Sequence, residues 1–90
     1  MKPYIEEHYE KHGTKESYKI RTFKDECDSI WFKEEDTQRV RVFSGHGWRL
    51  QIGDTQPILL EQGEKYNIPK NRFHRIIKGE GNLVIRLEII

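Results

Sequence analysis

The stretch from Gly63 to Lys78 constrains the fold of this chain more than any other part of its sequence. It predicts a turn at Gly63, a short strand over residues 65–68, a tight turn over residues 69–71, and a second strand that carries His74. The proline of the tight turn fixes φ and cannot extend a central ladder, and its asparagine tolerates a left-handed conformation. We therefore expect a hairpin that places His74 a few residues past a sharp corner, near the mouth of whatever the strands enclose.

The rest of the chain predicts short strands that are separated by glycine and polar turns. No helical period is found after residue 12, and strands at this spacing are typical of an all-β sandwich or barrel. Besides the two strands of the hairpin, we expect strands within residues 18–23, 30–34, 38–44, 48–52, 57–60 and 83–90.

The first residues of the chain follow a different pattern. Pro3 suits the first turn of a helix, and the glutamates after it suit the positive end of a helix dipole, so one or two helical turns are expected within residues 3–11. We therefore predict a short helical or irregular N-terminal segment over residues 1–15 and a β-barrel domain over residues 16–90.

Composition narrows the class of protein. Ninety residues make one domain, and 16 basic against 15 acidic side chains argue against a general polyanion binder, so no nucleic-acid partner is expected. No apolar run is long enough for a membrane span, and no signal peptide is recognised. A single cysteine, Cys27, excludes an internal disulfide and favours a reducing compartment. We expect a soluble cytoplasmic domain.

Strand periodicity predicts which side chains face the interior. Successive side chains of a strand alternate between its two faces, so the apolar set of each strand marks the inward face. Applied to the expected strands, this rule turns three polar side chains inward: Glu34, Gln38 and His74. It turns three arginines outward: Arg39, Arg41 and Arg49.

The spacing of the expected hairpin resembles the second motif of the cupin superfamily. That motif runs glycine, five residues, proline, one residue, glycine, two residues, histidine, three residues and asparagine. Gly63, Pro69 and His74 stand in register with it, whereas Asn71 replaces the second glycine and Lys78 the asparagine.

The first half of the chain resembles the first cupin motif in outline. That motif runs histidine, one residue, histidine, three or four residues, glutamate, six residues and glycine. With its glycine on Gly45, Gln38 takes the glutamate position, and Glu34 and Phe32 take the two histidine positions. The resemblance implies a small single-domain cupin, with a cupin-type jelly roll or small β-barrel.

The resemblance also implies a metal site with fewer ligands than usual. The typical cupin site takes two histidines and a glutamate from the first motif and one histidine from the second, and here only His74 remains. A divalent metal such as iron, manganese, nickel or zinc would have His74, Glu34 and Gln38, of which glutamine is a weak ligand. In the alternative interpretation these three side chains hydrogen-bond one another or, with Phe32, line a pocket for a polar ligand.

Three functions follow from these patterns. The first is a binding protein that holds a small polar molecule, such as a sugar or a carboxylate, inside the barrel. The second is a metal-dependent isomerase, lyase or dioxygenase with a reduced ligand set. The third is a dimeric interaction module, because the final strand carries apolar residues in both phases and one face beyond the interior then needs cover. A homodimer is expected, and the sequence decides neither catalysis nor the identity of the ligand.

Overall fold

The computed structural model describes residues 4–10, 13, 17–25 and 29–90, so Cys27 lies outside the described residues. Every helix or strand element within them is a β-strand, which confirms the all-β prediction. No helix in this part of the chain is long and apolar enough to cross a membrane. The strands are β1 (Ile5–Glu10), β2 (Ser17–Phe23), β3 (Gln38–His46), β4 (Arg49–Ile52), β5 (Ile58–Leu59), β6 (Lys65–Ile68), β7 (His74–Ile77) and β8 (Glu80–Ile89).

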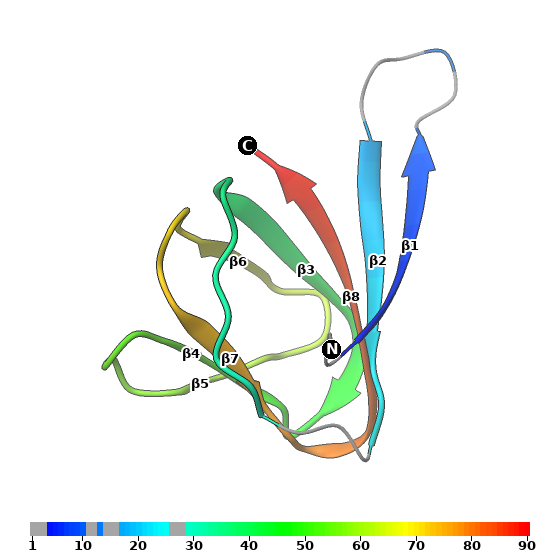
Figure 1. The fold of residues 1–90 in the computed structure, drawn as a ribbon. Helices are drawn as coiled ribbons and strands as arrows, with labels where there is room; N and C mark the ends of the chain where they lie inside the picture. The colour runs from blue at the N-terminus through cyan, green and yellow to red at the C-terminus, as the bar shows by residue number, and fades with distance from the viewer. Residues whose placement is uncertain (1–3, 11–12, 14–16, 26–28) are drawn as a thin grey trace.

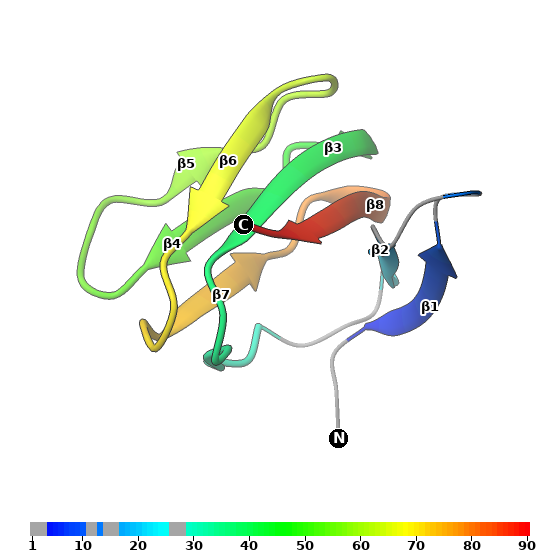
Figure 2. The ribbon, with the colours of Figure 1, turned by 90° about the horizontal axis from the view of Figure 1, so that it is seen from above.

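The strands form two antiparallel sheets that face each other. The larger sheet has five strands in the order β1-β2-β8-β3-β6, and the smaller has three in the order β5-β4-β7. Figure 1 shows β1, β2 and β8 on one side of the molecule and β4, β5 and β7 on the other, and Figure 2 shows the same arrangement from above. Strand β8, the last in sequence, lies between β2 and β3, so the chain ends in the middle of the larger sheet.

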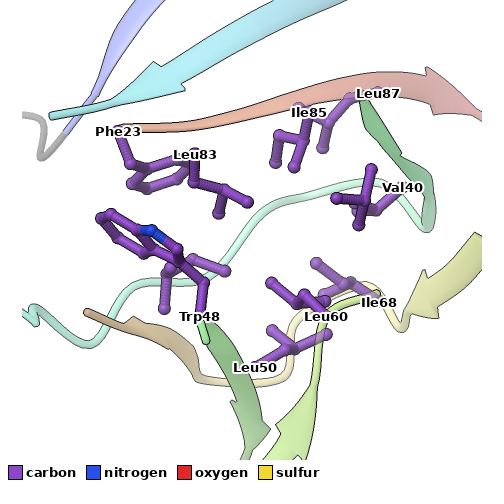
Figure 3. Packing of buried hydrophobic residues seen from close by; sticks show 11 residues of the cluster. Phe23, Val40, Trp48, Leu50, Leu60, Ile68, Leu83, Ile85 and Leu87 are labelled. Atoms are coloured by element: carbon purple, nitrogen blue, oxygen red, sulfur yellow. The ribbon is translucent and has the colours of Figure 1, made fainter. Parts of the chain in front are cut away.

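The space between the sheets is filled by apolar side chains from both of them. Figure 3 shows Phe23, Leu83 and Ile85 pointing from the larger sheet toward Trp48 and Leu50 of the smaller sheet and its flank. The ring centroids of Phe23 and Trp48 are 6.3 Å apart. The buried apolar core contains Phe23, Val40, Val42, Trp48, Leu50, Leu60, Ile68, Ile76, Leu83, Ile85 and Leu87.

The structure confirms which side chains of β3, β4 and β7 were predicted to face inward and which outward. Along β3 the side chains alternate between buried and exposed from Gln38 through Val42, and the two arginines among them are exposed. Arg49 of β4 is also exposed, whereas Leu50 beside it is buried. His74 and Ile76 of β7 are buried on the same inward face.

The segment that was expected to be a hairpin is a corner between the two sheets. Both of its strands form where the sequence predicts them, and Asn71 has the left-handed backbone that the turn requires, with φ at 58°. However, β6 pairs with β3 in the larger sheet and β7 pairs with β4 in the smaller one. The prediction of a hairpin is therefore wrong. The turn carries the chain from one sheet to the other and places His74 on the inner face.

Helical turns over residues 3–11 were also a wrong prediction. Residues Ile5–Glu10 form β1, which pairs with β2 along its whole length and makes the edge of the larger sheet. The proline and the glutamates favour a helix locally, but pairing with β2 favours a strand more. As a strand, this segment gains a hydrogen-bonded partner and brings Glu6 opposite Arg21.

The predicted strand over residues 30–34 is replaced by an irregular segment with one isolated bridge. Phe32 and His74 exchange two backbone hydrogen bonds, of 2.9 and 3.0 Å. The carbonyl of Glu34 accepts a hydrogen bond from the backbone N–H of Asn71 at 2.8 Å instead of joining a ladder. This segment therefore runs across the tight turn that precedes β7 and ties it down at two points.

The final strand exposes fewer apolar side chains on its outer face than its sequence indicates. Leu83, Ile85 and Leu87 face the core and are buried, whereas Val84 is half-buried on the outer face. Ile89 and Ile90 are more than half exposed, at 59% and 53%. The homodimer stays a prediction, and Ile89 and Ile90 are the exposed apolar residues at the end of the chain that a partner would cover.

Candidate functional site

The most buried charged group on the inner face is Arg21 of β2, whose side chain is 3% exposed. Its Nε donates a hydrogen bond to Oε1 of Glu6 at 2.6 Å, and its Nη1 lies 2.7 Å from Oε1 of Glu34. The ring of Tyr4 covers the guanidinium, with its centroid 4.1 Å from Cζ. A guanidinium has five donors in a planar fork, so it can hold two carboxylates at once. We call Arg21, Glu6, Glu34 and Tyr4 the arginine cluster.

Three parts of the chain meet in the arginine cluster. Glu6 lies directly opposite Arg21 in the register of β1 and β2, and Glu34 comes from the irregular segment before β3. Burial by itself would lower the pKa of Arg21, but the hydrogen bonds to Glu34 and Glu6 outweigh it and raise this pKa above its ordinary value. Arg21 is therefore a permanent cation, and its charge is already matched by two carboxylates.

His74 lies on the inner face of the smaller sheet and is 1% exposed. Burial lowers its pKa below the ordinary value of 6.5, while the hydrogen bond to Arg72 and the charge of Glu34 oppose that shift. The ring is therefore neutral at neutral pH. Its Nδ1 lies 3.2 Å from the carbonyl oxygen of Arg72, and a carbonyl only accepts, so the proton sits on Nδ1 and Nε2 carries a lone pair. The ring of Phe32 packs against the imidazole with 4.3 Å between centroids.

Gln38 begins β3 and is 3% exposed on the inner face. Its Oε1 is buried and has no hydrogen-bond partner among the described residues. It lines a hollow of about 20 Å³, which is room for about one water molecule. The other lining residues come from β2 and β8 and are Ser17, Tyr18, Lys19, Leu87, Glu88 and Ile89.

The structure brings together only part of the predicted site. Phe32 contacts His74, and the charge of Glu34 acts on His74, so these three residues share one region. Gln38 instead lines its own hollow between β2, β8 and β3. Glu34 pairs with Arg21, a residue that the predicted site did not include. The sequence carried one signal for Arg21, because alternation in β2 places it on the same face as Phe23, which is in the core.

The donor set does not fit a metal ion held by three protein ligands. The described residues include no group of three or more histidine, cysteine, aspartate or glutamate side chains that could hold a metal. Glu34, the one carboxylate of the predicted ligand set, is bound to the guanidinium of Arg21. A dication beside that guanidinium would be repelled, and His74 would be its single strong ligand.

Comparison with known proteins identifies the fold. No protein-family model matches this sequence, and no curated protein matches it. A cupin 2 conserved barrel domain protein from Leptotrichia buccalis superposes with a TM-score of 0.73 at 18% identity, over 97% of this chain and 40% of that chain. The chain thus spans less than half the length of that protein.

Two further solved structures are similar, and both are described as proteins of unknown function. The one from Acinetobacter sp. ADP1, assigned to DUF1255, has a TM-score of 0.73 and 18% identity over 84% of this chain and 71% of its own. The one from Vibrio parahaemolyticus has a TM-score of 0.72 and 15% identity over 92% of this chain and 83% of its own. This chain therefore has the cupin fold, as its two motifs implied, and identities this low define the fold alone.

Replacing Arg21 tests the arginine cluster. Arg21→Met keeps the length of the side chain but leaves the carboxylates of Glu6 and Glu34 together without their cation, at side-chain exposures of 12% and 20%. We expect the free energy of unfolding, measured by urea denaturation, to fall by about 3 kcal/mol. Arg41→Met, on the exposed outer face of β3, is the matched control and should change it by less than about 0.5 kcal/mol. Equal losses of the free energy of unfolding in the two variants would contradict the claim that Arg21 stabilises the fold through Glu6 and Glu34.

The lowered pKa of His74 predicts how stability depends on pH. A histidine with a lowered folded-state pKa contributes stability that is fully present above its unfolded pKa, near 6.5, and is lost as pH falls through the folded-state pKa. We expect the free energy of unfolding to fall as pH drops below about 6.5, and His74→Asn to fall less over the same range. Asparagine keeps a donor for the Arg72 carbonyl but does not titrate. His46→Asn, in an exposed position of β3, is the control. If the free energy of unfolding depends on pH in the same way in native protein and in His74→Asn, His74 is not the source of that dependence.

Proposed function

We propose that this protein binds a small polar molecule at the inner face of its barrel, with one polar group of the ligand in the hollow that Gln38 lines. The observation that carries the proposal is the buried carboxamide oxygen of Gln38, which has no partner among the described residues and lines a hollow. A buried acceptor without a partner costs about 1–3 kcal/mol, and a ligand that donates a hydrogen bond to it recovers that cost. His74, the other buried polar side chain of the predicted site, does not line this hollow.

Metal-dependent catalysis is the alternative, and one observation favours it. The hydrogen bond from Nδ1 to a backbone carbonyl fixes the ring of His74 in the tautomer that metal-binding histidines use. The pairing of Glu34 with Arg21 argues against metal-dependent catalysis, because this carboxylate is already bound to a guanidinium. We therefore place the enzyme second, and the two candidates differ in whether His74 is needed to hold a metal.

Metal content separates these two functions. We expect protein purified without added metal to contain no stoichiometric iron, manganese, nickel or zinc by elemental analysis, and His74→Ala to leave that result unchanged. The substitution should still lower the free energy of unfolding by about 1–3 kcal/mol, because the Arg72 carbonyl loses its partner. Stoichiometric metal in the native protein that disappears in His74→Ala would support the enzyme instead.

Gln38→Met tests the binding proposal directly. Methionine has a similar volume and no acceptor that must be satisfied, so the unliganded variant should be as stable as the native protein or more stable, by about 1 kcal/mol. A thermal-shift screen of small alcohols, amines and carboxylic acids should then find compounds that raise the Tm of the native protein but not that of Gln38→Met. Such a gain in stability with a loss of binding is the mark of a residue kept for a ligand.

Two results would count against the proposal. The first is a Gln38→Met variant that is clearly less stable than the native protein, which would mean that the carboxamide is a satisfied structural group. The second is a set of compounds that stabilise both proteins equally. Asn67→Met, on the exposed edge of β6, is the matched control for adding a methionine.

A further inference from the structure

Independently of the proposed function, we infer that the outer face of the smaller sheet binds single-stranded nucleic acid, with bases stacked on Trp31 and Phe73 and phosphates held by the cations beside them. This face points away from the larger sheet (Figure 1), and none of the described strands lies over it. The hollow that Gln38 lines is formed by β2, β3 and β8 of the larger sheet, so the two sites are separate.

Two exposed aromatic rings lie close together on this face. Trp31 is 40% exposed and Phe73 is 53% exposed. They flank the antiparallel bridge between Phe32 and His74, whose side chains pack against each other on the inner face, so Trp31 and Phe73 turn outward. The two are diagonal neighbours across the bridge, and such neighbours lie about 7–8 Å apart. This separation leaves room for one base on each ring.

A cation lies over each of the two rings. Cζ of Arg75 is 4.8 Å from the centroid of Trp31, and Nζ of Lys33 is 5.0 Å from the centroid of Phe73. Nε of Arg75 also donates a hydrogen bond to Oε1 of Gln51 at 2.8 Å, which ties this guanidinium to β4. The rings are therefore held against the sheet while about half of each stays exposed. Stacking a base on a ring that is already held costs less side-chain entropy than ordering a free one.

Positive charge on this face has no carboxylate to balance it. Arg49 of β4 is exposed, and Gln51, two residues further along the same strand, lies opposite Arg75 of β7. The outward positions of β4, β5 and β7, and residues 31 and 33 beside them, include no aspartate or glutamate. Within the residues that the structure describes, Lys33, Arg49 and Arg75 form no ion pair. Three cations are thus available to an anionic partner.

These features fit an unpaired nucleic-acid strand better than other partners. Bases of any sequence stack on exposed aromatic rings, and lysine and arginine beside the rings bind the phosphates. A second copy of this chain would bring the cations of two such faces together, and a peptide that is only acidic would leave both rings uncovered. The expectation of no nucleic-acid partner considered the net charge of the whole chain, which is +1, whereas these cations gather on one face.

The test measures the binding of a fluorescein-labelled oligothymidylate of about ten nucleotides by fluorescence anisotropy, at several salt concentrations. Trp31→Ala and Phe73→Ala each remove one ring, and Arg49→Gln removes one cation. The matched controls lie on the outer face of the larger sheet: Phe43→Ala removes a ring that is 41% exposed, and Arg41→Gln removes an exposed cation.

We expect Trp31→Ala and Phe73→Ala each to weaken binding at least about tenfold, because a stacked base is lost with each ring. Three phosphate contacts predict that the logarithm of the binding constant falls with the logarithm of the salt concentration with a slope of about −2. Arg49→Gln should reduce the size of this slope by about 0.7. Phe43→Ala and Arg41→Gln should change neither the affinity nor the slope.

Tryptophan fluorescence gives a second readout of the same site. The chain has two tryptophans, and Trp48 is fully buried, so a base on the outer face contacts only Trp31. The oligonucleotide should therefore quench the native protein and Phe43→Ala equally, and should leave the remaining fluorescence of Trp31→Ala unchanged.

Three results would overturn the inference. The first is an absence of binding in about 50 mM salt, where phosphate contacts are strong. The second is binding that the ring variants and Phe43→Ala weaken equally. The third is equal affinity for a DNA duplex of the same length or for polyglutamate, which would assign the face to another partner. None of them bears on the proposed function, whose tests use the Gln38 hollow.

Discussion

The ion-paired guanidinium of Arg21 is the interaction on which the rest of the inner face depends. A charge as buried as this one is tolerated only when it is paired and hydrogen-bonded, and the partners that satisfy it are Glu6 and Glu34. Glu6 belongs to an edge strand and Glu34 to a segment with little regular structure of its own. Arg21 therefore ties both to β2, the strand between the edge strand β1 and the central strand β8. The guanidinium thus adds a side-chain tie to the backbone hydrogen bonds that already hold β1 against β2 and the segment before β3 against His74 and Asn71.

The same pairing sets what the barrel can do chemically. A cupin fold places inward-facing side chains of two sheets around a common interior, but the chemistry comes from the residues at those positions. Here the carboxylate of Glu34 is bound to an arginine, His74 is neutral, and the buried oxygen of Gln38 has no partner in the part of the chain that the structure describes. We propose that these groups bind a small polar molecule through hydrogen bonds rather than a metal ion. The fold is shared with solved cupin structures, and the chemistry is decided by the polar groups of the present sequence.

Sequence periodicity predicted much of the fold, because strands alternate strictly and the apolar residues of β3, β4 and β7 are in phase. It failed where local signals and long-range pairing disagree. The residues Ile30, Phe32 and Glu34 alternate like a strand, but only Phe32 finds a ladder partner. The first residues read as a helix start, yet β2 supplies a partner for a strand.

Which of the candidate side chains are buried was largely predictable from the sequence, but their arrangement was not. Periodicity turned Glu34, Gln38 and His74 inward; Gln38 and His74 are buried, and Glu34 is half-buried against Arg21 although its predicted strand does not form. Their partners could not be read from spacing, because Arg21 meets Glu6 across 15 residues of sequence through strand register. The corner that separates β6 from β7 was missed for a similar reason, since a tight turn between strands fits a hairpin and a change of sheet equally well. The partners of Arg21 and the change of sheet between β6 and β7 depend on which strands pair in the folded protein, and residue type alone does not specify that.

The most direct test of this account is hydrogen exchange at the arginine Nε–H groups, followed by ¹H–¹⁵N NMR. Arg21 donates its Nε–H to Glu6 from a buried position, whereas Arg39 and Arg41 are exposed on the outer face of β3. The account predicts one arginine Nε–H, assigned to Arg21, that exchanges with solvent far more slowly than those of Arg39 and Arg41. Exchange of the Arg21 Nε–H at the rate of these exposed arginines would contradict it, because the guanidinium would then be open to water and free to bind an anion.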